Sequence, residues 1–412
     1  MDREPIRTLG LSACVLLAWS ATAWAADIKP LVDVRLRDEY VSQDGFTEDA
    51  NAETLRARLG FETGKVDDTS LLAEGSFNLA LDRRYRPDNS VPTYTQYPVV
   101  GDPADYAVSR LQLTNTALPS TTLILGRQVI NLDDQRFVGA AAWRQSEQTL
   151  DAVRAISTAG DLTIDLTFSN KFHRTSGVDS PQGTYKGRMV LANVGYSLGS
   201  LGKLIGFAYL LDFDPLPLSA ALNPIYASTS TYGGRFVGSQ PLGQTLRFGY
   251  ILSYATEQQR GDNPRQFTDD YFLAELSLSW QKFTLGAGNE ILDGNGTIGF
   301  VTPLATLHRV QGWVDKFTTT PPNGIDDRYG SLMWNSGRMG WLDNLSLTAV
   351  YHHYQAQRVM GSYGDEWNGL LTAKHQRYLL LLEWGDYRQG AATPATIARN
   401  TRKFWAELDY LW

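Results

Sequence analysis

Residues 268–281 read TDDYFLAELSLSWQ and alternate between apolar and polar side chains. Phe272, Leu276 and Trp280 fall on one face of an extended chain, and Glu275 and Ser279 fall on the other. Because successive side chains of a β-strand point to opposite faces, this stretch predicts a strand with one apolar and one polar face. It is roughly twice as long as the five or six residues of an ordinary strand, which favours a membrane-spanning strand over a soluble one.

The same alternation recurs along the whole chain and is clearest at 52–65, 71–82, 161–173 and 245–257. We count roughly 18 such segments, an even number as single-chain bacterial barrels require. The predicted strands are 28–41, 52–65, 71–82, 105–117, 121–130, 148–158, 161–173, 186–198, 203–213, 230–240, 245–257, 268–281, 282–292, 326–335, 345–357, 366–374, 377–388 and 402–412.

The connections between these segments alternate between short and long. Short turns occur at 66–70, 118–120, 159–160, 198–202 and 375–376, and long loops occur at 83–104, 131–147, 214–229 and 293–325. Short periplasmic turns and long extracellular loops are typical of outer-membrane barrels. The sequence therefore predicts an all-β fold, a transmembrane antiparallel up-and-down β-barrel. A soluble propeller or sandwich is the alternative, but no blade-length repeat is visible.

The first 25 residues have the features of a cleaved secretory signal peptide. Arg3 and Arg7 precede an apolar stretch that is too short to span a bilayer, and Ala23-Trp24-Ala25 supplies a small-residue cleavage site. Cys14 ends a lipoprotein-like box, but the apolar stretch continues past it, which favours cleavage after Ala25 over lipidation. The barrel domain is then 26–412, and it contains no cysteine.

Composition excludes several functional classes. The chain of 412 residues has a net charge of −7, which argues against a nucleic-acid partner. No apolar run after the signal peptide reaches the length of a transmembrane helix. Neither a cofactor nor a metal site is expected. These features place the protein in the outer membrane of a Gram-negative cell envelope, in contact with lipid.

The C-terminal segment supports this location. Phe404, Ala406, Leu408, Tyr410 and Trp412 alternate with polar residues up to an aromatic final residue. Such an ending resembles the signal that the barrel-assembly machinery recognises, so this machinery is an expected partner. The last strand should pair with the first, because an open sheet edge is not tolerated in lipid. An ordinary amphipathic strand is the alternative.

Inward-facing polar residues set the selectivity of a pore. If the non-apolar face points inward, the lumen receives the basic residues Arg35, Arg37, Arg56, Arg58, Arg110, Arg188, Arg235 and Arg247. It also receives the acids Asp33, Glu62, Glu74, Asp82, Asp165, Glu275, Glu290, Glu383 and Glu407. The arginines either bind an anionic solute or form structural ion pairs with these acids. The pattern does not decide on which faces Arg127 and Arg154 lie.

Two stretches do not have the pattern of strands. The first contains Arg136 and Arg144, and the second runs from Phe300 to Asp327. A loop of about 30 residues is too long for a passive connection, so we predict a constriction loop that folds into the pore and includes His308, Trp313, Asp315 and Lys316. His308 and Asp315 are expected to be packing partners rather than a catalytic pair.

These two stretches resemble the signatures of the bacterial alginate-export porin family. The motifs are GRQ (126–128), DQRFVG (134–139), WRQ (143–145), LDA (150–152), TPLATLH (302–308), GWVDKF (312–317) and PPNG (321–324). The resemblance covers about 30–412 and implies an 18-stranded outer-membrane barrel. It also implies that the lumenal arginines, with Arg127, Arg136 and Arg144, select an anionic uronate polymer.

The leading hypothesis is a passive outer-membrane channel for an anionic saccharide such as alginate. The alternative in transport is an uptake channel for small carboxylates or other hydrophilic solutes. A barrel enzyme is disfavoured, because the histidines fall on different predicted elements and no nucleophile elbow or metal-spaced cluster appears. A structural barrel with a plugged lumen is a third class.

Overall fold

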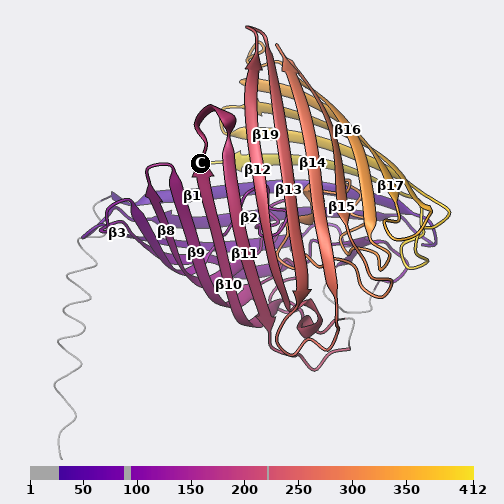
Figure 1. Cartoon of the computed structure of the whole chain (residues 1–412), viewed down its shortest axis with the longest axis horizontal. Coiled ribbons are helices and arrows are strands. Elements are labelled where there is room, and N and C mark those ends of the chain that lie inside the picture. Colours follow the sequence, from indigo (N-terminus) through magenta and orange to yellow (C-terminus); the bar gives the residue numbers. More distant parts are fainter. Residues whose placement is uncertain (1–26, 88–93, 220–221) are drawn as a thin grey trace, which may run out of the picture.

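A computed structural model describes residues 27–87, 94–219 and 222–412, and the predicted signal peptide lies outside these residues. The described chain forms one antiparallel sheet of 18 strands that closes on itself. Figure 1 shows these strands around a closed wall, with the longer loops gathered at one end. Each of the predicted segments is a strand, so the predicted fold class and strand number are confirmed.

The strand boundaries lie within a few residues of the predictions. The barrel strands are β1 (Lys29–Gln43), β2 (Ala50–Glu62), β3 (Thr69–Ala80), β6 (Asp105–Asn115), β7 (Thr121–Gln128), β8 (Thr149–Ala159), β9 (Leu162–His173), β10 (Thr184–Ser197), β11 (Lys203–Phe213), β12 (Thr229–Leu242), β13 (Leu246–Gln259), β14 (Thr268–Trp280), β15 (Phe283–Leu292), β16 (Ile325–Asn335), β17 (Asn344–Gln355), β18 (Ser362–His375), β19 (Tyr378–Gln389) and β20 (Thr401–Leu411).

Little other regular structure occurs in the described part of the chain. A short parallel pair, β4 (Arg86–Pro87) and β5 (Val99–Val100), lies in the first long loop. The described helices are the single 3-10 turns η2 (Gly199–Leu201), η3 (Pro224–Ala227) and η4 (Leu307–Arg309). None of these helices has the length or hydropathy needed to cross a bilayer.

The barrel closes where the last strand pairs with the first, as predicted. Leu36 on β1 lies opposite Leu408 on β20, and both side chains are exposed on the outer face. One position along, Arg37 lies opposite Glu407, and both side chains are buried inside. Outward leucines and inward charges therefore alternate through the closing seam, because successive side chains of a strand point to opposite faces.

The outer face is apolar around the barrel. Leu252 on β13 and Leu276 on β14 are about half exposed to the outside, whereas Ser253 points inward and is buried. Trp280 and Trp412 lie exposed at the ends of their strands, at the end of the barrel with short turns. Such positions suit an aromatic girdle, in which tryptophan rings lie at the interface between membrane and water.

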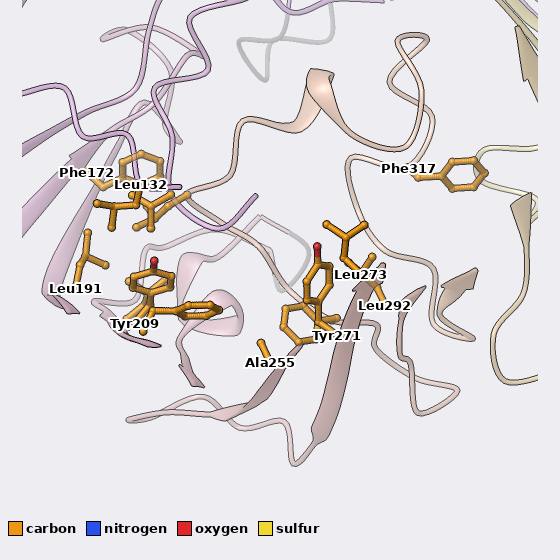
Figure 2. Packing of buried hydrophobic residues seen from close by; sticks show 14 of the residues in the cluster. Leu132, Phe172, Leu191, Tyr209, Ala255, Tyr271, Leu273, Leu292 and Phe317 are labelled. Carbon is orange, nitrogen blue, oxygen red and sulfur yellow. The ribbon is translucent and has the colours of Figure 1, made fainter. Parts of the chain in front are cut away.

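The inner face is less polar than predicted. On β11, Phe207, Tyr209, Leu211 and Phe213 point inward and are buried in a cluster that also contains Leu191 of β10. Figure 2 shows Leu191 and Tyr209 of this cluster close to Leu132, which comes from the loop between β7 and β8. Both faces of β11 are therefore apolar, one against lipid and one against a loop, so apolarity alone does not identify its outer face.

Two long loops fold into the lumen and pair with each other. They are loop A, residues 129–148 between β7 and β8, and loop B, residues 293–324 between β15 and β16. Val138 and Leu304 form a parallel bridge, and the Gly139 amide donates to the Leu304 carbonyl at 2.8 Å. A Cβ atom at Gly139 would lie 2.2 Å from the Thr306 hydroxyl, so this close approach requires glycine.

The outer face of the strands should tolerate charge far less than the inner face. We expect Leu252→Arg to destabilise the folded barrel by about 2–4 kcal/mol, the cost of an arginine near the bilayer midplane. Ser277→Arg, which adds the same side chain on the inner face of β14, should cost much less. The measurement is urea unfolding of the protein in lipid vesicles, and an equal loss for both variants would contradict this assignment of faces.

Candidate functional site

Loop A is anchored to the inner wall by charged and polar pairs. The buried Arg136 guanidinium donates to Glu290 of β15 at 2.7 Å and lies over the ring of Tyr271. Arg235 of β12 donates to the Asp134 carboxylate of loop A at 2.6 Å. Burying such charges is tolerated because each has a close partner of opposite sign. Arg136 and Arg235, predicted as selectivity residues, therefore hold loop A in place.

An imidazole joins the two loops to the barrel wall. His308 of loop B stacks on Trp143 of loop A, with ring centroids 4.0 Å apart and an interplanar angle of 2°. Its Nδ1 lies 3.0 Å from an Asp315 carboxylate oxygen, and its Nε2 lies 2.9 Å from a Glu383 oxygen of β19. Burial alone lowers the pKa of His308, but the two carboxylates outweigh it and raise this pKa to about 9.

Asp315 is held by several cations besides His308. Its carboxylate accepts from the Arg144 guanidinium at 2.9 Å and from the Lys403 ammonium at 3.4 Å. Burial alone raises the pKa of Asp315, but the surrounding cations hold it well below its usual range. The two ring nitrogens of His308 face carboxylates and not a nucleophile, so the geometry suits packing rather than catalysis.

The other predicted residues of the constriction loop flank Asp315. Burial lowers the pKa of the Lys316 ammonium to about 7, with a further contribution from the nearby charge of Lys403. The Lys316 ammonium lies 5.3 Å from the centre of the Tyr387 ring. Trp313 is half-buried.

The arginines of β1 and β2 form a row along the inner wall beside loop A. Each has an acidic partner: Arg35 pairs with Asp409 at 2.8 Å, Arg37 with Asp102 at 3.0 Å, Arg56 with Asp33 at 2.6 Å and Arg58 with Glu147 at 2.9 Å. Arg35 also donates to the loop A carbonyls of Ala142 and Trp143. The predicted lumenal arginines are thus brought together, and their ion pairs follow the structural alternative.

The row retains unused hydrogen-bond donors. On Arg56, Nε and Nη1 make no hydrogen bond to any described residue, and the same holds for Nε and Nη2 of Arg58. A guanidinium has five N–H donors, so one carboxylate leaves several of them for another acceptor. Because these donors are themselves buried, only the exposed parts of the row, 12% of the Arg35 side chain and 9% of the Arg58 side chain, can contact a passing anion.

Three further inward arginines lie outside this row. Arg110 of β6 pairs with Glu74 at 2.6 Å, and Arg154 of β8 pairs with the inward-facing Asp165. The Arg247 guanidinium donates to Ser239 at 3.2 Å near the short-turn end of the barrel. The structure thus decides the face of Arg154, which the sequence pattern left open.

Two predicted selectivity residues do not face the lumen. Arg188 lies opposite Asp212 on the outer face of β10, because Gly187 and Met189 on either side of it point inward. Arg127 lies across from Leu111, which is exposed on the outer face. The Arg127 guanidinium donates to Asp151 at 2.7 Å and to the Val108 carbonyl at 3.0 Å. The polar-inward rule fails here, because charged residues also occupy the outer face near the external rim.

Above the joined loops lies a cavity of about 590 Å³, which we call the external vestibule. Loops A and B line it together with the external loops that follow β9, β11 and β13. Arg174 lies over the Tyr185 ring at 4.6 Å and Arg265 lies over the Tyr226 ring at 4.5 Å. The sequence pattern does not reveal Arg174 and Arg265, because each lies in an external loop where no alternation of apolar and polar residues assigns the direction of its side chain.

The external vestibule is electropositive although the chain is acidic. Arg144, Arg174, Arg265 and the protonated His308 line it, whereas Asp315 is the one carboxylate among the described lining residues. Most of the other lining residues are threonines, small residues and aromatic rings. This combination suits a small anion with an apolar or aromatic body, because guanidinium groups bind carboxylates bidentately and rings pack against an apolar body.

Comparison with solved structures supports the barrel assignment. OpdK from Pseudomonas aeruginosa, solved with vanillate, matches with a TM-score of 0.69 and 14% identity over 93% of this chain and 98% of that one. OpdL from the same organism matches at 0.68 and 16%, over 94% and 99%. OccAB2 from Acinetobacter baumannii matches at 0.68 and 15%, over 93% and 98%. At this identity the likeness establishes the fold alone.

No protein-family model and no curated protein sequence matches the chain. The structural matches named above are not alginate-export porins, so they do not support that resemblance. They support the broader prediction of a porin-type barrel. The closed barrel with its apolar outer face places the protein in the outer membrane, as predicted.

The His308 network predicts that the anchoring of the two loops depends on pH. Below pH 6.5 the imidazole is protonated both folded and unfolded, so its stabilisation is fully present, and it is lost as the pH rises through about 9. We expect single-channel recordings to show a steady current at pH 6. At pH 9.5 the current should be larger and fluctuate more, because the two loops are then less firmly anchored in the lumen.

His308→Phe keeps a ring beside Trp143 but removes the charge, so its current should be noisy at both pH values. His375→Gln, at the far end of β18 from the loops, serves as a control and should behave as the unaltered protein does. An unaltered protein that is equally quiet at both pH values would contradict this role for His308.

Proposed function

We propose that this protein is a passive outer-membrane channel selective for small organic anions that carry a carboxylate. The observation that carries the proposal is the external vestibule, which is lined by three guanidinium groups and an imidazolium but by only one carboxylate among the described residues. A small carboxylate would bind here before it moves toward the row of arginines on β1 and β2.

The size of the vestibule favours a small solute over a polysaccharide. Its volume of about 590 Å³ lies in the range of ordinary small-molecule pockets. Below it, loops A and B pair directly across the lumen. A stiff uronate polymer needs a continuous wide path, whereas a small solute needs only a narrow one. The alginate hypothesis is therefore replaced by its stated alternative, uptake of small carboxylates.

The related fold adds support of a different kind. OpdK was crystallised with vanillate, which is an aromatic carboxylate. The vestibule of this chain offers the complementary groups, since Arg174 and Arg265 each lie over a tyrosine ring. A solute with a ring and a carboxylate would meet aromatic surfaces and charged donors at the same place.

The arginine row fits a channel rather than a tight receptor. Conduction requires binding that is favourable enough for the solute to enter but weak enough for it to leave. Arg35 and Arg58 keep 12% and 9% of their side chains exposed, and each is already paired with an acid that reduces its attraction for another anion. Successive weak contacts of this kind would pass an anion without trapping it.

Planar-bilayer recordings test the proposal. Benzoate added on the loop side should block the current of a small inorganic anion, whereas uncharged benzyl alcohol should not. Arg174→Gln and Arg265→Gln should each weaken the benzoate block by about tenfold, the value of one charge-assisted hydrogen bond. Arg84→Gln removes an exposed arginine of another external loop and should leave the block unchanged.

Other outcomes would point to other functions. Block by a short uronate oligomer but not by benzoate would favour the saccharide hypothesis. A protein that inserts but conducts no ions would indicate a plugged structural barrel and overturn the proposal.

A further inference from the structure

The outer face of the barrel carries an unusual pair of lysines near its external rim. Lys171 of β9 and Lys186 of β10 are directly opposite each other in the sheet. Their neighbours Phe172 and Tyr185 point inward and are buried, so both lysine side chains point outward. Opposite positions in an antiparallel sheet place the two Cβ atoms about 4.5–5.5 Å apart.

Two like charges at this spacing destabilise a sheet unless an anion lies between them. Among the described residues, neither ammonium has an ion pair or a hydrogen bond. Asp151, across from Lys171 on β8, is already held by Arg127 at 2.7 Å and lies 3.1 Å from His173. Asp151 is thus shared with Arg127 and His173 and compensates the charge of Lys171 only in part.

The β11 side carries one paired and one exposed carboxylate. Asp212 is paired with Arg188 at 3.2 Å. Asp214, just past the end of β11, donates its amide to the Lys186 carbonyl, and its side chain is exposed. Asp214 follows β11 on the side of Lys186 away from Lys171, and among the described residues its carboxylate forms no ion pair with either lysine.

The position of the pair indicates what kind of anion would reach it. Along β9 the outward residues Leu166 and Phe168 are followed by Lys171, and along β10 the outward Val190 is preceded by Arg188 and Lys186. An apolar surface therefore changes to a basic one toward the external ends of both strands. In a bilayer this change coincides with the boundary between acyl chains and headgroups.

We propose that Lys171, Lys186 and Arg188 bind the phosphate of a phosphorylated glycolipid in the outer leaflet. The phosphate lies between the two ammonium groups, and Arg188, whose side chain is 80% exposed, turns from Asp212 to donate to it. The acyl chains of the same lipid pack on Phe168 and Val190 below. This site lies outside the lumen, so it does not depend on the proposed transport function.

Binding of bisphosphorylated lipid A to the purified full-length barrel in detergent tests the proposal. We expect native mass spectrometry to show retained lipid A, and the double variant Lys171→Gln/Lys186→Gln to bind at least tenfold more weakly. Lys171→Arg/Lys186→Arg keeps both charges and should bind as the unaltered protein does. Each variant is first checked for a folded barrel by its heat-dependent gel mobility.

A matched control uses another pair of outward arginines. Arg388 and Arg402 lie near the external ends of β19 and β20 and share the Asp386 carboxylate. Replacing both with glutamine removes the same amount of charge from the rim and should leave lipid A binding unchanged.

Three results would overturn the proposal. The first is equal binding of lipid A by the Lys171/Lys186 double variant and the unaltered protein, and the second is equal binding of phosphorylated and dephosphorylated lipid. The third is full displacement of the lipid by millimolar inorganic phosphate, which would indicate a site for free phosphate rather than for a lipid headgroup.

Discussion

The structure depends on one constraint, that a backbone polar group facing lipid must find its hydrogen-bond partner within the protein. The seam between β1 and β20 satisfies it by closing the sheet. The shortest strand pairing of the barrel joins β6 and β7, which pair only over Leu111–Asn115 and Leu123–Arg127. Beyond this stretch the chain leaves the wall to form loop A, and the Arg127 guanidinium donates to the exposed Val108 carbonyl. A residue that sequence reasoning assigned to selectivity thus completes the wall.

Closure creates a second requirement, because a barrel of this size encloses more space than its own side chains fill. Loops A and B occupy part of it, held by an apolar cluster around Phe137 and Phe300 and by buried ion pairs such as Arg136–Glu290. Each buried charge needs a partner in this setting. Most lumenal arginines therefore have a structural role, and only those that keep an exposed part, such as Arg35 and Arg58, can contact a solute.

The local charge inside the barrel changes from one level to the next and does not follow the net charge of −7 of the whole chain. The joined loops contain alternating cations and anions, with His308 between Asp315 and Glu383. The vestibule above them has an excess of cations. Because field lines concentrate in a cleft with low-dielectric walls, this local excess matters more to an approaching anion than the net charge of the whole chain does.

The sequence by itself determined the barrel, its strand number and its loop lengths. This was possible because lipid outside and polar groups inside require apolar and polar residues to alternate along each strand. It also located the four inward arginines of β1 and β2. It did not determine the partners of those arginines: Arg35 meets Trp143 of loop A, and Arg37 meets Asp102, across large sequence separations. Nor did it reveal the apolar inner face of β11, the outward positions of Arg127 and Arg188, or the vestibule built by Arg174 and Arg265. Alternation of apolar and polar residues predicts which face of a strand a side chain occupies. It does not predict which loop or strand packs against that face, because segments far apart in the sequence come together only when the barrel closes.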